Sequence, residues 1–255
     1  MSVQHKTHSF FTVLALSCLF SPFAASDNKH VGLKAPLPSI STQSSLKRNQ
    51  SAESGVIELR GGNFIKPFQT QISPLPTLHK TKPYQHLISE AALKWNIEQS
   101  LIYAVMHVES YFNPTAVSSA QALGLMQVTE NGAVLEFSKR FLGGKTLARE
   151  QVFVPRTNID IGTAYLYLLD ATYLSQIRSP KTRLIATIAA YNCGLTNLMK
   201  YTFDTKSLDY FVYRVNQTTT EEWREMLTQQ FPIAETRAYV AKVLEKKAHY
   251  QQLIH

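Results

Sequence analysis

The sequence contains only two cysteines, Cys18 and Cys193, in 255 residues. Cys18 lies in an N-terminal segment that we expect to be removed on export. The mature chain would then retain Cys193 alone, which excludes an intramolecular disulfide, although an exported protein tolerates such bonds. The stability of the fold must therefore come from a hydrophobic core.

Charged residues are also few, at 17% of the chain, against 44% hydrophobic and 11% aromatic residues. This composition excludes a wholly disordered chain. The net charge of +8 is concentrated near the N-terminus: residues 27–83 hold 8 Lys and Arg against 3 acids, and residues 84–255 hold 17 against 15. Such a basic stretch suits loose attraction to lipid head groups or cell-wall polymer, or is a solvated tail. Without a compact basic patch, we predict no nucleic-acid partner.

Motifs for metals and phosphates are absent as well. The histidines are scattered, and none forms a ligand set with Cys or an acid at convincing spacing. No glycine-rich phosphate loop is present. We therefore predict a function that needs no metal and no cofactor.

The first 26 residues are typical of an export signal. Lys6 provides a basic start, and residues 9–20 are largely apolar but too short to span a bilayer comfortably. The small residues of 24–26 predict cleavage before Asp27 and a periplasmic location. The alternative is a lipoprotein signal in which Cys18 is lipidated, which would associate the protein with the outer membrane.

The rest of the chain divides by composition. Residues 27–83 are rich in Pro, Ser and Lys and predict an extension or tether, with one candidate strand at residues 56–59. Residues 84–255 show helical periodicity and few strand signals. We predict a mostly α fold: one helical catalytic domain behind an extended N-terminal segment.

Helix boundaries are marked by local signals. Apolar spacing predicts a helix over residues 87–95 that Asn96 ends, and a second from Glu98 to about Asn113, where Pro114 disfavours continuation. Later signals are the N-cap Ser179 before Pro180, the stop at Gly194, capping-box spacing at 218–222, and a final helix from about Ala234.

Glu109 is unusual in its predicted helix. It follows Leu101, Ile102 and Val105 by eight, seven and four residues, which places it on the apolar face. It also lies near the helix C-terminus, where the dipole disfavours negative charge. Both effects raise a carboxyl pKa and favour a general acid that is protonated near neutral pH. From periodicity alone, a glutamate turned to water at a frayed helix end explains the pattern equally well.

Four motifs in order decide between these interpretations. They are ESYFNP at 109–114, AVS and ALGLMQ at 116–118 and 122–127, NIDIGTAYL at 158–166, and AAYNCG at 189–194. This set resembles the soluble lytic transglycosylase domain, a lysozyme-like module of murein-degrading enzymes, and most closely its membrane-bound transglycosylase C branch. The resemblance covers about residues 84–250.

The resemblance implies roles for named residues. Glu109 would be the acid/base, Ser118 would hydrogen-bond it or orient the substrate, and Gln127 would line the sugar groove. Further along, Tyr191 would reach back to the carboxyl, Asn192 would support the groove, and Tyr239 would be a late groove tyrosine. From the residues alone, Ser118 is equally a turn residue and Tyr191 equally a core residue. Two departures from the family pattern are Gln121, where many members have Gly, and Cys193, which we expect to pack as a small hydrophobe.

The chemistry that the resemblance implies uses a single glutamate on glycan strands of peptidoglycan. No second acid has a motif-supported position, since Glu130 and Glu136 are expected at the surface and Asp160 in a first helical turn. The products would be 1,6-anhydromuramoyl sugars, formed without water. Two alternatives remain open: a hydrolytic muramidase on the same fold, and a non-catalytic peptidoglycan-binding or scaffold protein.

Overall fold

The computed structural model of this protein describes residues 78–254, all of which belong to one compact unit. The predicted export signal, the alternative anchor at Cys18 and the candidate strand at residues 56–59 lie outside the described residues. Within the described part, no helix has both the length and the apolar character needed to cross a bilayer.

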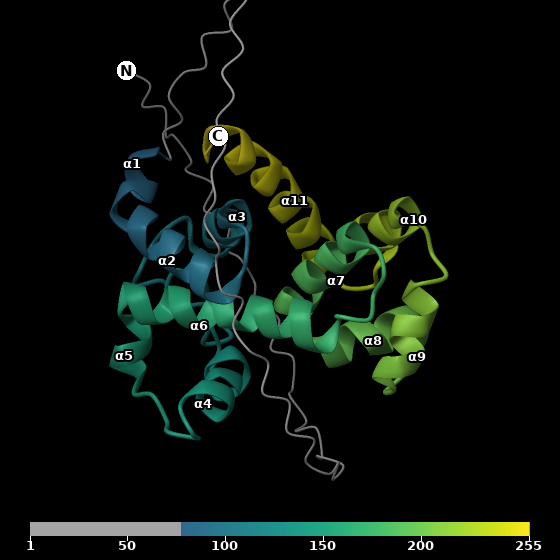
Figure 1. Ribbon diagram of the computed structural model, residues 1–255, viewed down its shortest axis with the longest axis horizontal. Helices are drawn as coiled ribbons and strands as arrows, with labels where there is room; N and C mark the ends of the chain where they lie inside the picture. The colour runs from purple at the N-terminus through teal and green to yellow at the C-terminus, as the bar shows by residue number, and fades with distance from the viewer. Residues whose placement is uncertain (1–77, 255) are drawn as a thin grey trace, which may run out of the picture. The chain divides into compact units, whose positions relative to one another are not determined.

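The described residues are mostly helical, as predicted, and contain no β-strand, only isolated antiparallel bridges of Leu123 with Val117 and Val128. In Figure 1, α3 lies between α2 and α11, and α7 to α10 gather on the right. The α-helices are α1 Leu78–Thr81, α2 Gln85–Trp95, α3 Gln99–Ser110, α4 Leu135–Phe141, α5 Arg149–Phe153, α6 Pro155–Tyr167, α7 Pro180–Cys193, α8 Leu195–Phe203, α9 Leu208–Val215, α10 Thr220–Glu225 and α11 Ala234–Ile254. A 3₁₀ turn, η1 Lys82–Tyr84, and three π-helical segments, η2 Glu130–Val134, η3 Leu168–Tyr173 and η4 Met226–Gln230, extend or join them.

Helix α3 lies in the core, and its residues 100–106 are all buried. Asn96 adopts a left-handed conformation (φ 52°) and ends α2, as predicted. Helix α11 packs along α3, and the nearly buried Lys247 pairs with Glu98 at the N-terminus of α3. The C-terminal helix therefore fixes the helix that carries Glu109.

The end of α3 differs from the prediction. The helix stops at Ser110, three residues before the predicted end, because Tyr111 and Phe112 both have positive φ, 51° and 63°. This turn buries the Phe112 ring and lets the Ser110 hydroxyl donate to the Leu125 carbonyl at 2.7 Å. Tertiary packing, rather than Pro114, sets this boundary.

Helix α6 crosses α2 (Figure 1). Asp160 accepts hydrogen bonds from the Lys94 ammonium at 2.8 Å and from the Trp95 indole at 2.6 Å. The prediction for Asp160 was wrong in one respect: α6 starts at Pro155, so Asp160 lies in the second turn, held by α2 rather than by the helix dipole. On the same helix, a Cβ at Gly162 would lie 2.5 Å from the Met126 sulfur, so only glycine allows this approach.

The predicted N-terminal caps of α7 and α10 are confirmed, and the predicted stop at Gly194 differs in geometry. The Ser179 hydroxyl accepts a hydrogen bond from the Thr182 backbone at the start of α7. Thr219 and Glu222 form a reciprocal capping box on α10. Gly194 has the expected positive φ of 82°, but its ψ of 143° is extended, so the chain turns directly into α8 rather than closing a left-handed cap.

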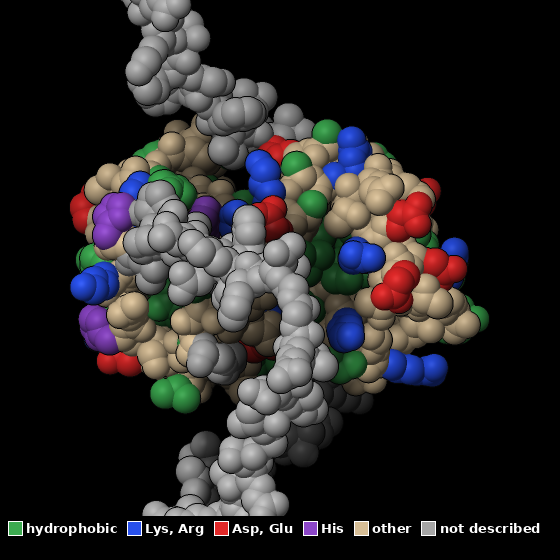
Figure 2. Space-filling model, turned by 90° about the horizontal axis from the view of Figure 1, so that it is seen from above, with side chains coloured by type: hydrophobic (Ala, Val, Ile, Leu, Met, Phe, Trp, Pro, Cys, Tyr) green, Lys and Arg blue, Asp and Glu red, His purple; other side chains and the backbone are tan. Residues whose placement is uncertain are grey.

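Residues 78–83, which composition assigns to the extension, are helical in the structure. Thr81 is buried, with 3% of its surface exposed. On the face seen in Figure 2, side chains of opposite charge are interspersed over the described part of the chain.

Candidate active site

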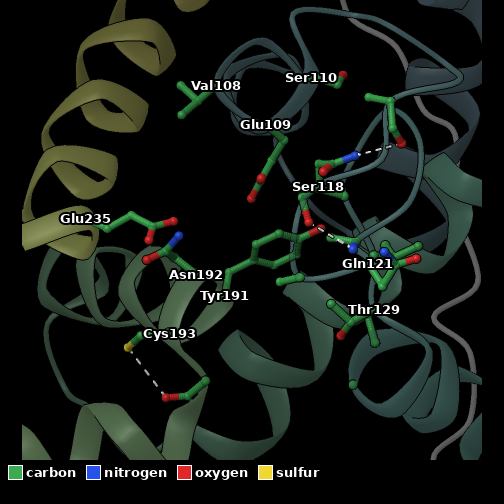
Figure 3. Close-up of a pocket in the computed structure, with 18 of the residues that line it drawn as sticks. Val108, Glu109, Ser110, Ser118, Gln121, Thr129, Tyr191, Asn192, Cys193 and Glu235 are labelled. Carbon is green, nitrogen blue, oxygen red and sulfur yellow. Dashed lines mark hydrogen bonds between the residues drawn. The ribbon is translucent and has the colours of Figure 1, made fainter. Parts of the chain in front are cut away.

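A cleft of about 860 Å³ opens between α3, α7 and α11. The end of α3, the loop that follows it, η2, the end of α7 and the start of α11 all line it. Figure 3 shows that Glu109, Ser118 and Tyr191 point into this space from three different segments. Parts of the chain that are far apart in sequence thus contribute to one site: residues within 107–133, Tyr165, residues 191–194 and residues within 233–236.

Glu109 is the last residue but one of α3, and its side chain is partly exposed to the cleft. Burial raises its pKa to about 8. A contact with the Tyr239 hydroxyl lowers this pKa, and the negative charge of Glu235 raises it. The pKa of Glu109 is therefore raised, as its position on the apolar face predicted, and the carboxyl keeps its proton at neutral pH.

Tyr239 on α11 is buried and faces Glu109. Its hydroxyl approaches the carboxyl closely enough to affect its pKa, yet forms no well-aligned hydrogen bond within the described residues. Burial and the nearby Glu109 charge raise the pKa of Tyr239 well above its ordinary value, so the phenol stays protonated. Tyr239 thus lies behind the glutamate rather than along the lining of the cleft.

Tyr191 on α7 lines the cleft, and its ring lies 5.6 Å from that of Tyr165. Its hydroxyl donates to the backbone carbonyl of Met126 at 2.9 Å. Burial raises the pKa of Tyr191 well above its ordinary value, and the charge of Glu109 adds to that rise. The side chain therefore lies in the electrostatic field of the glutamate while its hydroxyl is anchored to the loop before Gln127.

Ser118 and Gln127 both line the cleft, and both hold the loop between them. The Ser118 hydroxyl accepts a hydrogen bond from the Ala122 backbone at 3.0 Å. The Gln127 amide donates to the carbonyls of Ala116 and Gly124 at 3.1 and 2.9 Å. These contacts give each residue a structural role, and their roles toward a substrate stay predictions.

Asn192 joins the two helices that flank the cleft. Its side-chain oxygen accepts a hydrogen bond from the Thr236 hydroxyl at 2.8 Å, which ties the end of α7 to the start of α11. Its amide nitrogen forms no hydrogen bond within the described residues. Cys193, next to it, is buried and packs as expected, with 4% of its surface exposed.

Sequence reasoning missed Glu235, which lines the cleft from the first turn of α11. It precedes Tyr239 by four residues and so shares a helix face with it, which is the signal that places it at the site. Glu130 also lines the cleft, where it is exposed, as expected, and pairs with Arg149 at 3.3 Å. Glu136 lies outside the cleft and accepts a hydrogen bond from Tyr173.

Gln121, the departure from the family pattern, has a positive φ of 61° and lines the cleft. Its side-chain oxygen accepts a hydrogen bond from Arg149 at 3.2 Å. The residue therefore keeps the left-handed backbone that glycine allows, with Arg149 fixing its side chain. No group of three His, Cys, Asp or Glu in residues 78–254 is arranged to hold a metal ion, and a metal-free function stays a prediction.

The sequence profile of the transglycosylase SLT domain matches residues 86–213, half of the chain. The chain belongs to this family. Relatives named membrane-bound lytic murein transglycosylase C are 38% identical over 169 residues in Cronobacter sakazakii and 37% identical over 195 residues in Edwardsiella ictaluri. These alignments cover 66% and 76% of this chain but 46% and 53% of the relatives, so the chain spans about half of their length.

Solved structures of the family have the same fold. The lytic transglycosylase Slt of Pseudomonas aeruginosa, crystallised as an inactive mutant, is 26% identical with a TM-score of 0.52, covering 70% of this chain and 25% of that one. A 70-kDa soluble lytic transglycosylase in complex with bulgecin A is 26% identical with a TM-score of 0.53, covering 69% and 25%. The lysozyme-like fold class expected from the sequence is thereby confirmed.

Proposed function

We propose that this protein is a peptidoglycan lytic transglycosylase that cleaves the β-1,4 bond between N-acetylmuramic acid and N-acetylglucosamine and leaves a 1,6-anhydromuramoyl end. One observation carries the proposal: Glu109, which stands in the family motif, lines a large cleft, and its pKa is raised to about 8. Family membership and the names of the relatives support it.

Glu109 would supply both proton transfers. In its protonated form it donates to the glycosidic oxygen, and the bond from that oxygen to C1 of the muramoyl sugar breaks. The N-acetyl group of the same sugar stabilises the cationic C1. The Glu109 carboxylate then takes the proton of the C6 hydroxyl while this oxygen bonds to C1. The glutamate ends the cycle protonated, and no water is consumed.

The other cleft residues would bind and orient the glycan. Ser118 accepts a hydrogen bond from the backbone, so its own hydroxyl hydrogen remains for a sugar oxygen. The Asn192 amide nitrogen is unused within the described residues and lines the cleft. Three further residues would hold the walls of the cleft around Glu109. The Tyr191 hydroxyl and the Gln127 amide bind the loop backbone, and the Tyr239 hydroxyl faces the Glu109 carboxyl.

Two of the solved structures support this interpretation. One is an inactive mutant of a lytic transglycosylase with a glutamate changed to glutamine, and the other is a transglycosylase bound to bulgecin A. We infer that the analogous change here, Glu109→Gln, abolishes activity.

A hydrolytic muramidase is the second candidate, because Glu235 places another carboxylate in the cleft. Most glycosidases use a second carboxylate as nucleophile or as the base that activates water. The two reactions differ in their products: hydrolysis leaves a reducing muramic acid, and transglycosylation leaves a 1,6-anhydro end. A non-catalytic scaffold protein is disfavoured because Glu109 stands in its full motif in a member of the lytic transglycosylase family.

The decisive experiment compares purified wild-type protein with Glu109→Gln on isolated sacculi and analyses released muropeptides by mass spectrometry. We expect 1,6-anhydro products from the wild type and a loss of at least about 10⁴-fold in the variant, since acid/base catalysis contributes about 10²–10⁴-fold and Glu109 acts twice. Binding to insoluble peptidoglycan should survive the substitution. A folded variant that releases anhydro products near the wild-type rate would contradict the mechanism.

We further propose that the protein acts in the periplasm after cleavage before Asp27, with glycan strands as its partner. The relatives' names, which include the word membrane-bound, keep a lipid-anchored form at Cys18 as the alternative. N-terminal sequencing of the exported protein distinguishes them. A lipid-modified Cys18 at the mature terminus would place the enzyme at the outer membrane.

A further inference from the structure

Two large apolar side chains are exposed inside the cleft. Tyr111, directly after α3, is 43% exposed, and Val117, in the following loop, is 48% exposed. The other exposed large apolar side chains of the described residues lie outside the cleft lining. Apolar surface that stays open in a binding cleft rather than joining the core indicates a contact surface for a ligand.

Neighbouring side chains contact the exposed Tyr111 ring. Its backbone is left-handed, a conformation unfavourable for a residue with a Cβ, and the next residue, Phe112, is buried. The His107 ring packs edge-on against Tyr111, with ring centroids 5.1 Å apart. His107 is in turn hydrogen-bonded through Nδ1 to the Tyr250 hydroxyl at 2.8 Å. Helix α11 thus braces the aromatic ring from behind.

A cation lies over the same ring. The Lys80 ammonium, from α1, is 3.9 Å from the centre of the Tyr111 ring. Its charge also acts on His107. Burial and neighbouring cations, including Lys80, lower the pKa of His107 to about 4. No carboxylate of residues 78–254 forms an ion pair with Lys80. The Lys80 ammonium therefore lies against Tyr111, a residue of the cleft lining, without a carboxylate partner among the described residues.

Aromatic faces bind the apolar C–H faces of sugar rings, and an ammonium binds carboxylates. We propose that Tyr111, Val117 and Lys80 form a subsite for a saccharide that carries a peptide stem. The sugar ring packs against Val117 and the part of Tyr111 that Lys80 leaves exposed, and Lys80 binds a carboxylate of the peptide. This inference rests on the proposed function, because it assigns the glycan of that function to this end of the cleft.

The subsite predicts a preference for glycan strands with intact stems. Removal of the stems by an amidase leaves the sugar and the lactyl carboxylate but takes away the peptide carboxylates. Lys80 then loses its partner, whereas the contacts of Tyr111 and Val117 with the sugar remain. A substitution of Lys80 should therefore weaken the binding of stem-bearing strands alone, whereas a substitution of Tyr111 or Val117 should weaken the binding of strands with and without stems.

The test measures binding of short glycan strands, with stems or stripped of them, to full-length protein carrying Glu109→Gln, which prevents turnover. Lys80→Met keeps the apolar stem of the lysine, and we expect about threefold to fivefold weaker binding of stem-bearing strands only. Tyr111→Asn keeps a residue that tolerates the left-handed backbone, and we expect about tenfold weaker binding of both ligands. Tyr111→Phe, the matched control, should bind like the parent.

Val117→Ser tests the apolar surface a second time. It should weaken the binding of both ligands severalfold and leave the melting temperature unchanged. Wild-type affinity of Tyr111→Asn and Val117→Ser would overturn the subsite. Equal weakening of both ligands by Lys80→Met would assign Lys80 to the lactyl carboxylate and overturn the stem assignment. Failure of the proposed function is a separate result: wild-type protein that binds strands without releasing anhydro products contradicts the mechanism and leaves the binding differences to stand.

Discussion

The side-chain oxygen of Asn158 accepts a hydrogen bond from the Met126 backbone N–H at 2.8 Å. The same side chain donates to the carbonyls of Leu123 and Val152 at 2.9 and 3.0 Å. A fully buried residue of α6 therefore satisfies three backbone groups and fixes the turn at Gly124 that enters the cleft. Val154 occupies the N-cap position of α6, so Asn158 acts through these tertiary contacts and not as a helix cap.

Asn158→Ala should destabilise the fold by about 2–4 kcal/mol, because three buried backbone groups lose their partners. For a domain of this size, a drop in the melting temperature of roughly 5–15 °C would follow. Asn131→Ala, at an exposed position of the cleft rim, is the control and should melt like the wild type. An unchanged melting temperature of Asn158→Ala would show that the turn does not depend on this side chain.

Activity should fall as the pH rises through about 8. Glu109 must carry a proton to act as general acid, and its pKa is raised to about 8. The rate of anhydro-product release from pH 5 to pH 10 should show this single ionisation on its alkaline limb. A limb that falls near the ordinary glutamate value would contradict the protonated-acid assignment.

The same pKa shift makes stability depend on pH. Between the unfolded value of 4.5 and the folded value of about 8, the native state keeps a proton that the unfolded state has lost. Stability therefore falls with rising pH across this window and levels off above it. Glu109→Gln removes the dependence, so the melting-temperature difference between variant and wild type should grow in favour of the variant from pH 5 to pH 8. A constant difference would show that the carboxyl is not shifted.

Two neighbours of Glu109 should move the alkaline limb of the pH–rate profile in opposite directions. The Tyr239 contact lowers the pKa of Glu109, so Tyr239→Phe should shift the limb to higher pH. The Glu235 charge raises that pKa, so Glu235→Gln should shift it to lower pH. Because the Tyr239 hydroxyl is buried without a well-aligned partner, its removal should cost no stability. Shifts of the same sign in both variants would refute this electrostatic arrangement.

The domain boundary stays a prediction that truncation tests. A fragment from residue 75 to the C-terminus should fold and keep its activity on sacculi, because it contains the whole compact unit that the structure describes. A fragment from residue 84 should melt at a lower temperature, since it lacks the buried Thr81 and the cation–π contact of Lys80 with Tyr111. Equal melting temperatures would place the boundary at Pro83, as composition suggests.

The helices follow from the sequence because their signals are local. Asn96, Ser179 and Thr219 each satisfy or end a helix through contacts within a few residues, and the structure confirms all three. The apolar spacing before Glu109 likewise fixes which face of α3 the carboxyl occupies. The end of α3 was misplaced because burial of Phe112, a tertiary contact, outweighs the local signal of Pro114.

The motifs of the sequence determined the family and singled out Glu109 as the proposed acid/base, and the helical periodicity determined the predominance of helix. The tertiary structure decided how far the pKa of this carboxyl rises. Burial raises it most, and Tyr239 and Glu235, more than a hundred residues beyond Glu109, act on it only once α11 packs along α3. The tertiary structure also decided that Ser118 and Gln127 hold the loop between them. Electrostatic and packing interactions sum over groups that are close in space, and no spacing along the chain encodes those distances.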